Sequence, residues 1–135
     1  MAINPDPQDL ASFVGADWEG PLTMVNLLKF ADQADYGEAD EEPCTGAEAY
    51  ARYGVLAAPH VMASGATILY QGDVKFMLIG DDSEAWDEVI VVKYPSRQAF
   101  IDMVGNPEYQ ALSIHRTAAL SRAALLPSVH GESPF

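Results

Sequence analysis

Two stretches of this chain are apolar at both alternating sets of positions, and this pattern restricts the possible folds most strongly. The first, residues 22–30 (LTMVNLLKF), would place apolar side chains on both sides of an extended strand. The second, residues 89–92, is the run Val-Ile-Val-Val. Because successive side chains of a strand point to opposite faces of its sheet, strands of this kind must be covered on both faces.

The other expected elements follow from caps, glycines and prolines. Apolar spacing and capping residues predict helices at about residues 5–14, 45–64, 98–104 and 106–116. Further strands are expected at residues 66–71, 74–79, 86–94 and 120–126.

Two local signals add detail to this arrangement. Gly72-Asp73 predicts a two-residue hairpin turn between the strands 66–71 and 74–79. Pro59 lies inside the longest helix, where it removes one backbone hydrogen bond, so a kink or a break is expected there.

The order of elements indicates an α+β fold of the ferredoxin-like kind, with one antiparallel sheet and helices on one face. We expect one domain over residues 1–135, with its core at about 21–126, an acidic loop at 31–43 and a flexible tail at 127–135. No helix remains to cover the second face of the sheet. The pattern therefore predicts a homodimer in which two such faces meet.

The charge balance excludes several classes of partner. Twenty acidic residues oppose seven basic ones, and the formal net charge is −13. A nucleic-acid-binding protein needs a basic surface, and an anionic membrane repels an acidic one, so neither partner is expected. We expect a cytoplasmic protein, because the start of the chain lacks signal-peptide features and Cys44 is its single cysteine.

The sequence offers no spacing typical of a cofactor or metal site. It has no G-x-G-x-x-G, no Walker loop and no G-x-S-x-G. Three scattered histidines and one cysteine lack zinc spacing, and the acidic residues 32–42 lack the spacing of a calcium loop, so we interpret them as a solvated loop. We predict that no metal and no organic cofactor is needed.

Three segments together resemble a known family. The strands at residues 25–30 (VNLLKF) and 86–97 (WDEVIVVKYPSR) and the helix start at 106–110 (NPEYQ) are similar to an uncharacterised family of dimeric α/β barrels, the domain of unknown function 1330. The resemblance covers about residues 21–126. It implies a ferredoxin-like subunit, a two-fold dimer with facing sheets and a central cavity. It implies no activity, because the superfamily includes cofactor-free monooxygenases, small-lactone isomerases and haem enzymes.

Asn26 and His60 are the main candidates for a functional site. Asn26 puts an amide on an otherwise apolar strand face, where it either bonds to neighbouring backbone or orients a ligand. His60 follows Pro59 and is the candidate catalytic residue, since an imidazole can act as a general base near neutral pH. The alternative is a half-buried histidine without catalytic function. Tyr53, in the same stripe of that helix as His60, is a candidate for lining the cavity.

Further candidates lie at the ends of the expected strands. Trp86 and Asp87 either pack at the rim of the sheet or line the mouth of a cavity. Lys29 and Arg97 flank the same region, where they either are ordinary surface cations or attract a carboxylate substrate. His115 fits hydrogen bonding at a surface or interface, with haem ligation as the alternative.

These residues leave two functions open. The first is a cofactor-independent enzyme, resembling a monooxygenase or an isomerase, in which Asn26 orients a small metabolite and His60 moves a proton. The second is a non-catalytic dimer that binds a small ligand or only pairs with itself. A cavity lined by Asn26, His60 and Tyr53 would favour the enzyme.

Overall fold

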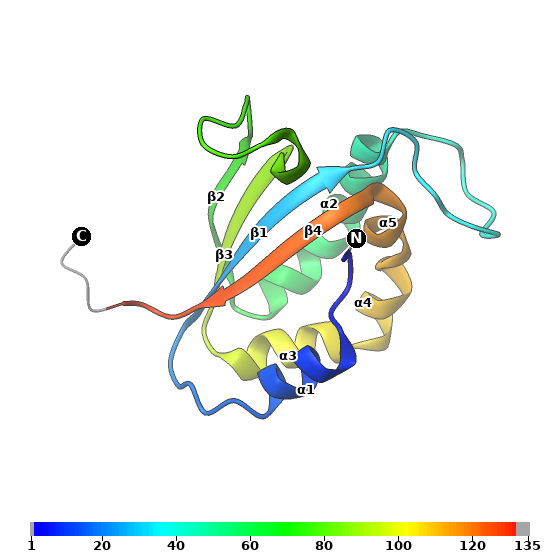
Figure 1. Cartoon of the computed structure of the whole chain (residues 1–135). Helices are drawn as coiled ribbons and strands as arrows, with labels where there is room; N and C mark the ends of the chain where they lie inside the picture. The colour runs from blue at the N-terminus through cyan, green and yellow to red at the C-terminus, as the bar shows by residue number, and fades with distance from the viewer. Residues whose placement is uncertain (1, 132–135) are drawn as a thin grey trace.

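The computed structural model describes residues 2–131, in which an antiparallel sheet carries all of its helices on one face (Figure 1). In chain order the elements are α1 (Pro7–Val14), β1 (Leu22–Phe30), α2 (Gly46–Ala63), β2 (Thr67–Asp73), the single 3-10 turn η1 (Asp82–Glu84), β3 (Glu88–Tyr94), α3 (Arg97–Gly105), α4 (Pro107–Leu112), α5 (Ile114–Ala119) and β4 (Leu120–Ser128). The strand order is β2-β3-β1-β4, and every neighbouring pair is antiparallel. The predicted α+β, ferredoxin-like fold class is confirmed.

Local sequence signals explain where the helices begin. Asp6 caps α1 by accepting a hydrogen bond from the Gln8 backbone N–H at 2.8 Å. Thr45 and Glu48 bond reciprocally to each other's backbone N–H groups, forming a capping box at the start of α2. Asn106 caps α4 in the same way as Asp6 caps α1. No helix in the described part of the chain is long and apolar enough to cross a membrane.

The core lies between the sheet and the helices. Leu22, Met24 and Leu28 point from β1 into this layer and are 1 %, 2 % and 0 % exposed. Val92 and Tyr94 of β3 pair with Met24 and Leu22 in the register and are buried beside them. Alternation along β1 therefore places Asn26 on the same, helix-facing side.

The opposite side of the sheet carries no helix among the described residues (Figure 1). We call this surface the open face, and register and alternation give it these residues: Thr23, Val25, Leu27, Lys29, Tyr70, Val89, Val91, Lys93, Arg122, Ala124 and Leu126. Its centre is apolar, and Tyr70 and Leu126 at its edges are 58 % and 49 % exposed. The strands thus have the two apolar sides expected from the sequence, and the subunit covers only one of them.

The expected hairpin at Gly72-Asp73 is wrong. Both residues belong to β2, and residues 74–81 form a loop instead of a strand. A two-residue hairpin of this type needs positive φ angles in its turn, and Gly72 is not among the glycines that adopt one. Gly72 serves a different purpose, because the Tyr70 ring lies over it and would overlap any Cβ at this position.

Three other features differ from the expectation. α2 runs through Pro59 to Ala63 without a break. The helix expected at 106–116 is divided at Ser113 into α4 and α5. The last strand extends to Ser128, so the expected tail begins later, and its residues 132–135 lie outside the described residues.

Candidate functional site

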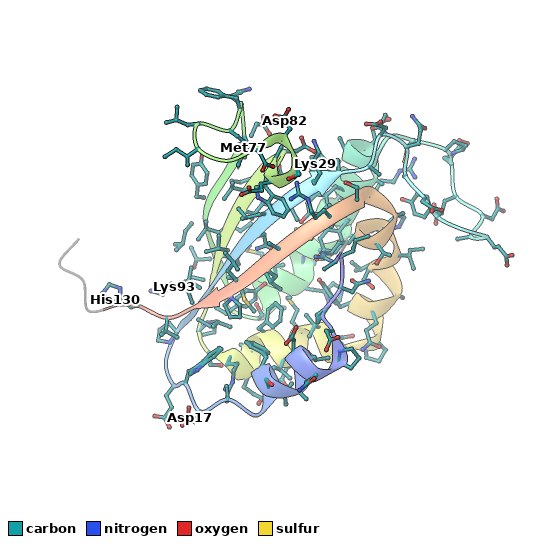
Figure 2. All side chains as sticks on the ribbon, in the orientation of Figure 1. Asp17, Lys29, Met77, Asp82, Lys93 and His130 are labelled. Carbon is teal, nitrogen blue, oxygen red and sulfur yellow. The ribbon has the colours of Figure 1, made fainter. Side chains whose placement is uncertain are left out.

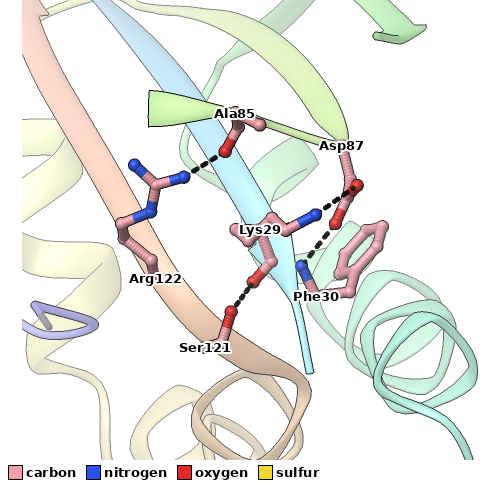
Figure 3. A network of polar contacts seen from close by, with 6 residues as sticks. All are labelled: Lys29, Phe30, Ala85, Asp87, Ser121 and Arg122. Atoms are coloured by element: carbon pink, nitrogen blue, oxygen red, sulfur yellow. Dashed lines mark hydrogen bonds and ion pairs between the residues drawn. The ribbon is translucent and has the colours of Figure 1, made fainter. Parts of the chain in front are cut away.

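Three residues predicted from the sequence, Lys29, Trp86 and Asp87, come together at one end of the open face. Lys29 Nζ lies 3.2 Å from Asp87 Oδ1 (Figure 3). The other carboxylate oxygen accepts a hydrogen bond from the Phe30 N–H at 2.8 Å, and the Asp87 N–H donates to the Leu28 carbonyl at 2.7 Å. The end of β1 therefore holds the Asp87 carboxylate in a fixed position beside Lys29.

Arg122 completes this group, and we refer to Lys29, Trp86, Asp87 and Arg122 as the Lys29–Arg122 cluster. Its guanidinium carbon lies 4.1 Å from the centre of the Trp86 ring, a cation–π contact. The guanidinium also donates a hydrogen bond to the Ala85 carbonyl (Figure 3). Sequence reasoning did not select Arg122, because its approach to Lys29 depends on the pairing of β4 with β1.

The cluster carries an excess of positive charge. Lys29 and Arg122 are direct cross-strand partners, and like charges in that position repel each other. Asp87 neutralises one of the two cations. Within residues 2–131 no other ion pair is formed, so no carboxylate is paired with Arg122. Within these four residues, two cations therefore meet one carboxylate, in a chain of net charge −13.

Arg97 does not join the cluster, and its expected placement beside Lys29 is wrong. It follows the last residue of β3, whereas Lys29 lies near the first residue of that strand. Figure 2 shows the same separation for Lys93, which lies at the far end of the sheet from Lys29. The Arg97 guanidinium instead donates to the Ala16 carbonyl and so anchors the loop between α1 and β1.

Asn26 and Tyr53 are satisfied within the layer between sheet and helices. Asn26 Nδ2 donates to the Ile90 carbonyl on the neighbouring strand at 3.1 Å. The Tyr53 and Tyr109 hydroxyl groups lie 2.5 Å apart and bond to each other. Burial raises the pKa of Tyr53 far above its ordinary value, and the neighbouring Tyr109 adds to this shift. These groups therefore act as paired, neutral contacts of the core.

His60 is not brought together with Asn26. It lines a hollow of about 340 Å³ on the helix layer, together with Ser64, Asp102 and Asn106. Its ring contacts that of Tyr109 edge to face, with centres 6.1 Å apart. Neither Asn26 nor Tyr53 lines this hollow. The arrangement that would have favoured an enzyme using Asn26 and His60 is absent from the hollow.

Glu88 is a candidate that sequence reasoning missed. It lies on the helix-facing side of β3, and its Oε1 accepts a hydrogen bond from Gln71 Nε2 at 3.2 Å. Its Oε2 is buried and has no hydrogen-bond partner among the described residues. Burial raises the pKa of Glu88, the negative charge of Asp73 adds to the rise, and the bond from Gln71 opposes it. A carboxyl group in this state can exchange a proton with a bound molecule.

His115 forms a side-chain hydrogen bond, in agreement with the predicted hydrogen bonding at a surface or interface. Its Nδ1 lies 2.7 Å from the Tyr36 hydroxyl, which also accepts a hydrogen bond from Arg52. The acidic loop is therefore attached to α2 and α5 through Tyr36. Among residues 2–131 no group of three or more histidine, cysteine or acidic side chains is placed to hold a metal ion. That folding needs no metal or organic cofactor stays a prediction.

The fold and the bare apolar face together define a class, a ferredoxin-like α+β subunit with one uncovered sheet face. The family model for a domain of unknown function, DUF1330, matches residues 41–128. The chain belongs to this family. No curated protein matches it.

Solved structures support the same assignment. The protein RPA0582 of Rhodopseudomonas palustris, described as a protein of unknown function, is 36 % identical, with a TM-score of 0.87 over 97 % of this chain and 98 % of that one. A Dabb family protein with a ferredoxin-like fold from Mesorhizobium loti is 12 % identical, with a TM-score of 0.53 over 82 % and 97 % of the two chains. A candidate antibiotic biosynthesis monooxygenase from Caulobacter crescentus is 15 % identical, with a TM-score of 0.51 over 84 % and 92 %. The latter two share the fold alone.

Proposed function

We propose that the chain works as a homodimer that binds a small carboxylate-bearing molecule at the Lys29–Arg122 cluster. The observation that carries this proposal is the direct cross-strand pairing of two cations, Lys29 and Arg122, of which only Lys29 has a carboxylate partner among the described residues. Such a pair costs stability in the free protein. A bound anion would remove that cost, since a carboxylate matches the planar donor group of arginine.

The exposed area of the subunit supports the dimer. The chain exposes 8740 Å². A folded monomer of 14.6 kDa is expected to expose about 6,900 Å². The excess is larger than the roughly 800 Å² that each partner contributes to an interface of standard size. Burying the apolar open face against a second copy would remove part of this excess.

In such a dimer the two sheets would enclose a space, and the cluster would lie at one end of it. We call this end of the space the mouth. The Trp86 ring beside Arg122 offers an apolar surface for the rest of the ligand, so we expect a carboxylate attached to an aromatic or aliphatic group. The acidity of the chain as a whole disfavours large polyanions. The monooxygenase description of the Caulobacter protein belongs to that protein and does not identify this ligand.

Trp86 provides the experiment. A Trp18→Phe background leaves Trp86 as the only tryptophan, and its fluorescence is followed during titration with benzoate, hexanoate and the uncharged benzamide. We expect a saturable change with a carboxylate and none with benzamide. Arg122→Ala should raise the Kd about tenfold or more, as expected for loss of a charge-assisted contact. Lys93→Ala, at the other end of the open face, is the matched control and should change the Kd less than twofold. Equal binding to Arg122→Ala would contradict the proposal.

An enzyme that transfers a proton is the second candidate, and the unpartnered Oε2 of Glu88 favours it. Glu88 points into the helix-facing layer, so this chemistry would occur away from the Lys29–Arg122 cluster. Native mass spectrometry of freshly purified protein would identify a retained small molecule. Conversion of that molecule by the wild type and not by Glu88→Gln would support an enzyme, and equal conversion by both would exclude a catalytic role for Glu88.

A further inference from the structure

The loop that follows β2 carries three of the four most exposed large apolar side chains of the described residues. Phe76, Leu78 and Ile79 are 72 %, 83 % and 90 % exposed. We call residues 74–80 the arm. Figure 1 shows this segment standing beyond the ends of β2 and β3, and Figure 2 places Met77 at that end of the molecule. The subunit itself offers these side chains no apolar surface to pack against.

The base of the arm is attached to the sheet. The Val74 N–H donates to the Asp87 carbonyl at 2.9 Å, so the arm begins beside the Lys29–Arg122 cluster. At its other end, Asp81 accepts a hydrogen bond from the Ser83 N–H at 2.9 Å and caps η1. Apolar side chains that face solvent on a segment fixed at both ends indicate a contact surface.

The surface that this arm extends is the open face. β2 leads directly into the arm. Tyr70, an exposed residue of the open face, lies in β2 four residues before the arm begins. Positive charge gathers on the same surfaces, because Lys75 lies in the arm and three of the other six basic residues lie on the open face. Two copies of net charge −13 repel each other, so they approach best through their least acidic surfaces.

We infer that the arm packs against the second copy of the chain and closes the mouth beside the Lys29–Arg122 cluster, so that each site is complete only in the dimer. This inference rests on the proposed dimer and adds the partner contact to it. Phe76, Leu78 and Ile79 would then be buried between the copies. They would also shield the apolar part of a bound carboxylate from water.

Sedimentation equilibrium of arm variants tests the inference. The triple variant Phe76→Ser, Leu78→Ser, Ile79→Ser should raise the Kd of the dimer at least roughly a hundredfold, since buried apolar anchors dominate interface energies. Val55→Ser is the matched control, because Val55 is 76 % exposed on α2, in the helix layer. It should leave the Kd within threefold of the wild type.

Two further measurements keep the outcomes separate. The single variant Ile79→Asp replaces the triple variant if the latter fails to fold. Exchange of subunits between labelled and unlabelled dimers, followed by native mass spectrometry, replaces the Kd if that is too small to measure, and should become at least tenfold faster. If the wild type is a dimer and the arm variants change neither its Kd nor its exchange rate, the inferred contact of the arm with the second copy is wrong, and the dimer stands. A monomeric wild type overturns the dimer and the arm together.

Discussion

Asn26 is the clearest case of a polar side chain that the fold itself satisfies. It lies on the helix-facing side of β1, and its amide reaches across to the Ile90 carbonyl. A buried hydrogen bond of this kind links two central strands, and removing one partner leaves the other desolvated and unpaired. The amide therefore contributes to the stability of the sheet.

Replacing Asn26 with Leu tests this role. We expect Asn26→Leu to lower the free energy of unfolding by about 1–3 kcal/mol, because the Ile90 carbonyl loses its donor. Thr23→Val, on the other face of the same strand, should change it by less than about 0.5 kcal/mol. Urea unfolding of both variants is the measurement. An Asn26→Leu variant as stable as the wild type would return Asn26 to the candidates for ligand binding.

Glu88 makes the stability of the folded protein depend on pH. Its folded-state pKa is raised by burial, so the folded state binds the proton more tightly than the unfolded state. The resulting stability is fully present below the ordinary glutamate pKa and is lost as the pH rises through the raised pKa.

Glu88→Gln removes this titration. We therefore expect the stability of the variant, measured relative to the wild type, to increase as the pH rises through the raised pKa and then to level off. Thermal unfolding of both proteins across the acidic to neutral range measures it. A constant difference at every pH would show that the pKa of Glu88 is the same in the folded and unfolded states.

At the scale of elements, the packing of α2 depends on its first residue. The Gly46 N–H donates to the Ala31 carbonyl at 3.0 Å, and a Cβ on Gly46 would overlap the carbonyl oxygens of Ala31 and Ala119. These oxygens belong to the backbone and cannot move aside as a side chain could. The helix therefore approaches the ends of β1 and α5 as closely as it does because Gly46 has no side chain.

Two substitutions in the same helix should have opposite effects. Gly46→Ala should destabilise the protein by roughly 1–3 kcal/mol through overpacking. The Cβ added by Gly54→Ala would meet no atom within 4 Å. This substitution should stabilise the protein by about 0.5–1 kcal/mol, since alanine favours the helix. Chemical denaturation of the two variants under one condition measures both effects. Equal effects of the two changes would contradict the close approach at Gly46.

The sequence predicts elements well where a local signal determines them. Thr45 and Asn106 cap the helices expected at residues 45–64 and 106–116, and the two-sided apolar strands form the centre of the sheet. The hairpin prediction failed because Gly72 serves the packing of the Tyr70 ring, a contact that no turn pattern reveals. Lys29 and Arg122 meet because β4 pairs with β1 in the register that places these two residues opposite each other, and that pairing depends on the tertiary structure.

At the scale of the whole molecule, the open face predicts the oligomeric state. We expect sedimentation at micromolar concentration to give about twice the chain mass of 14.6 kDa. Val91→Asp would put a charge at the centre of the apolar open face and should shift the protein to the monomer, because an unpaired buried charge is costly. Lys93→Ala on the same face serves as the control and should remain dimeric. A wild type that sediments as a stable monomer would contradict the dimer.

The uncovered side of the sheet also affects how a newly made chain matures. A lone chain can bury only the helix-facing half of its apolar strands, so its last folding step would be a collision with another copy and its rate would depend on concentration. Before pairing, the net charge of −13 would oppose aggregation of such chains through their uncovered strands. Selection on the acidic residues of such a chain would then reflect the time between synthesis and pairing as much as the finished protein.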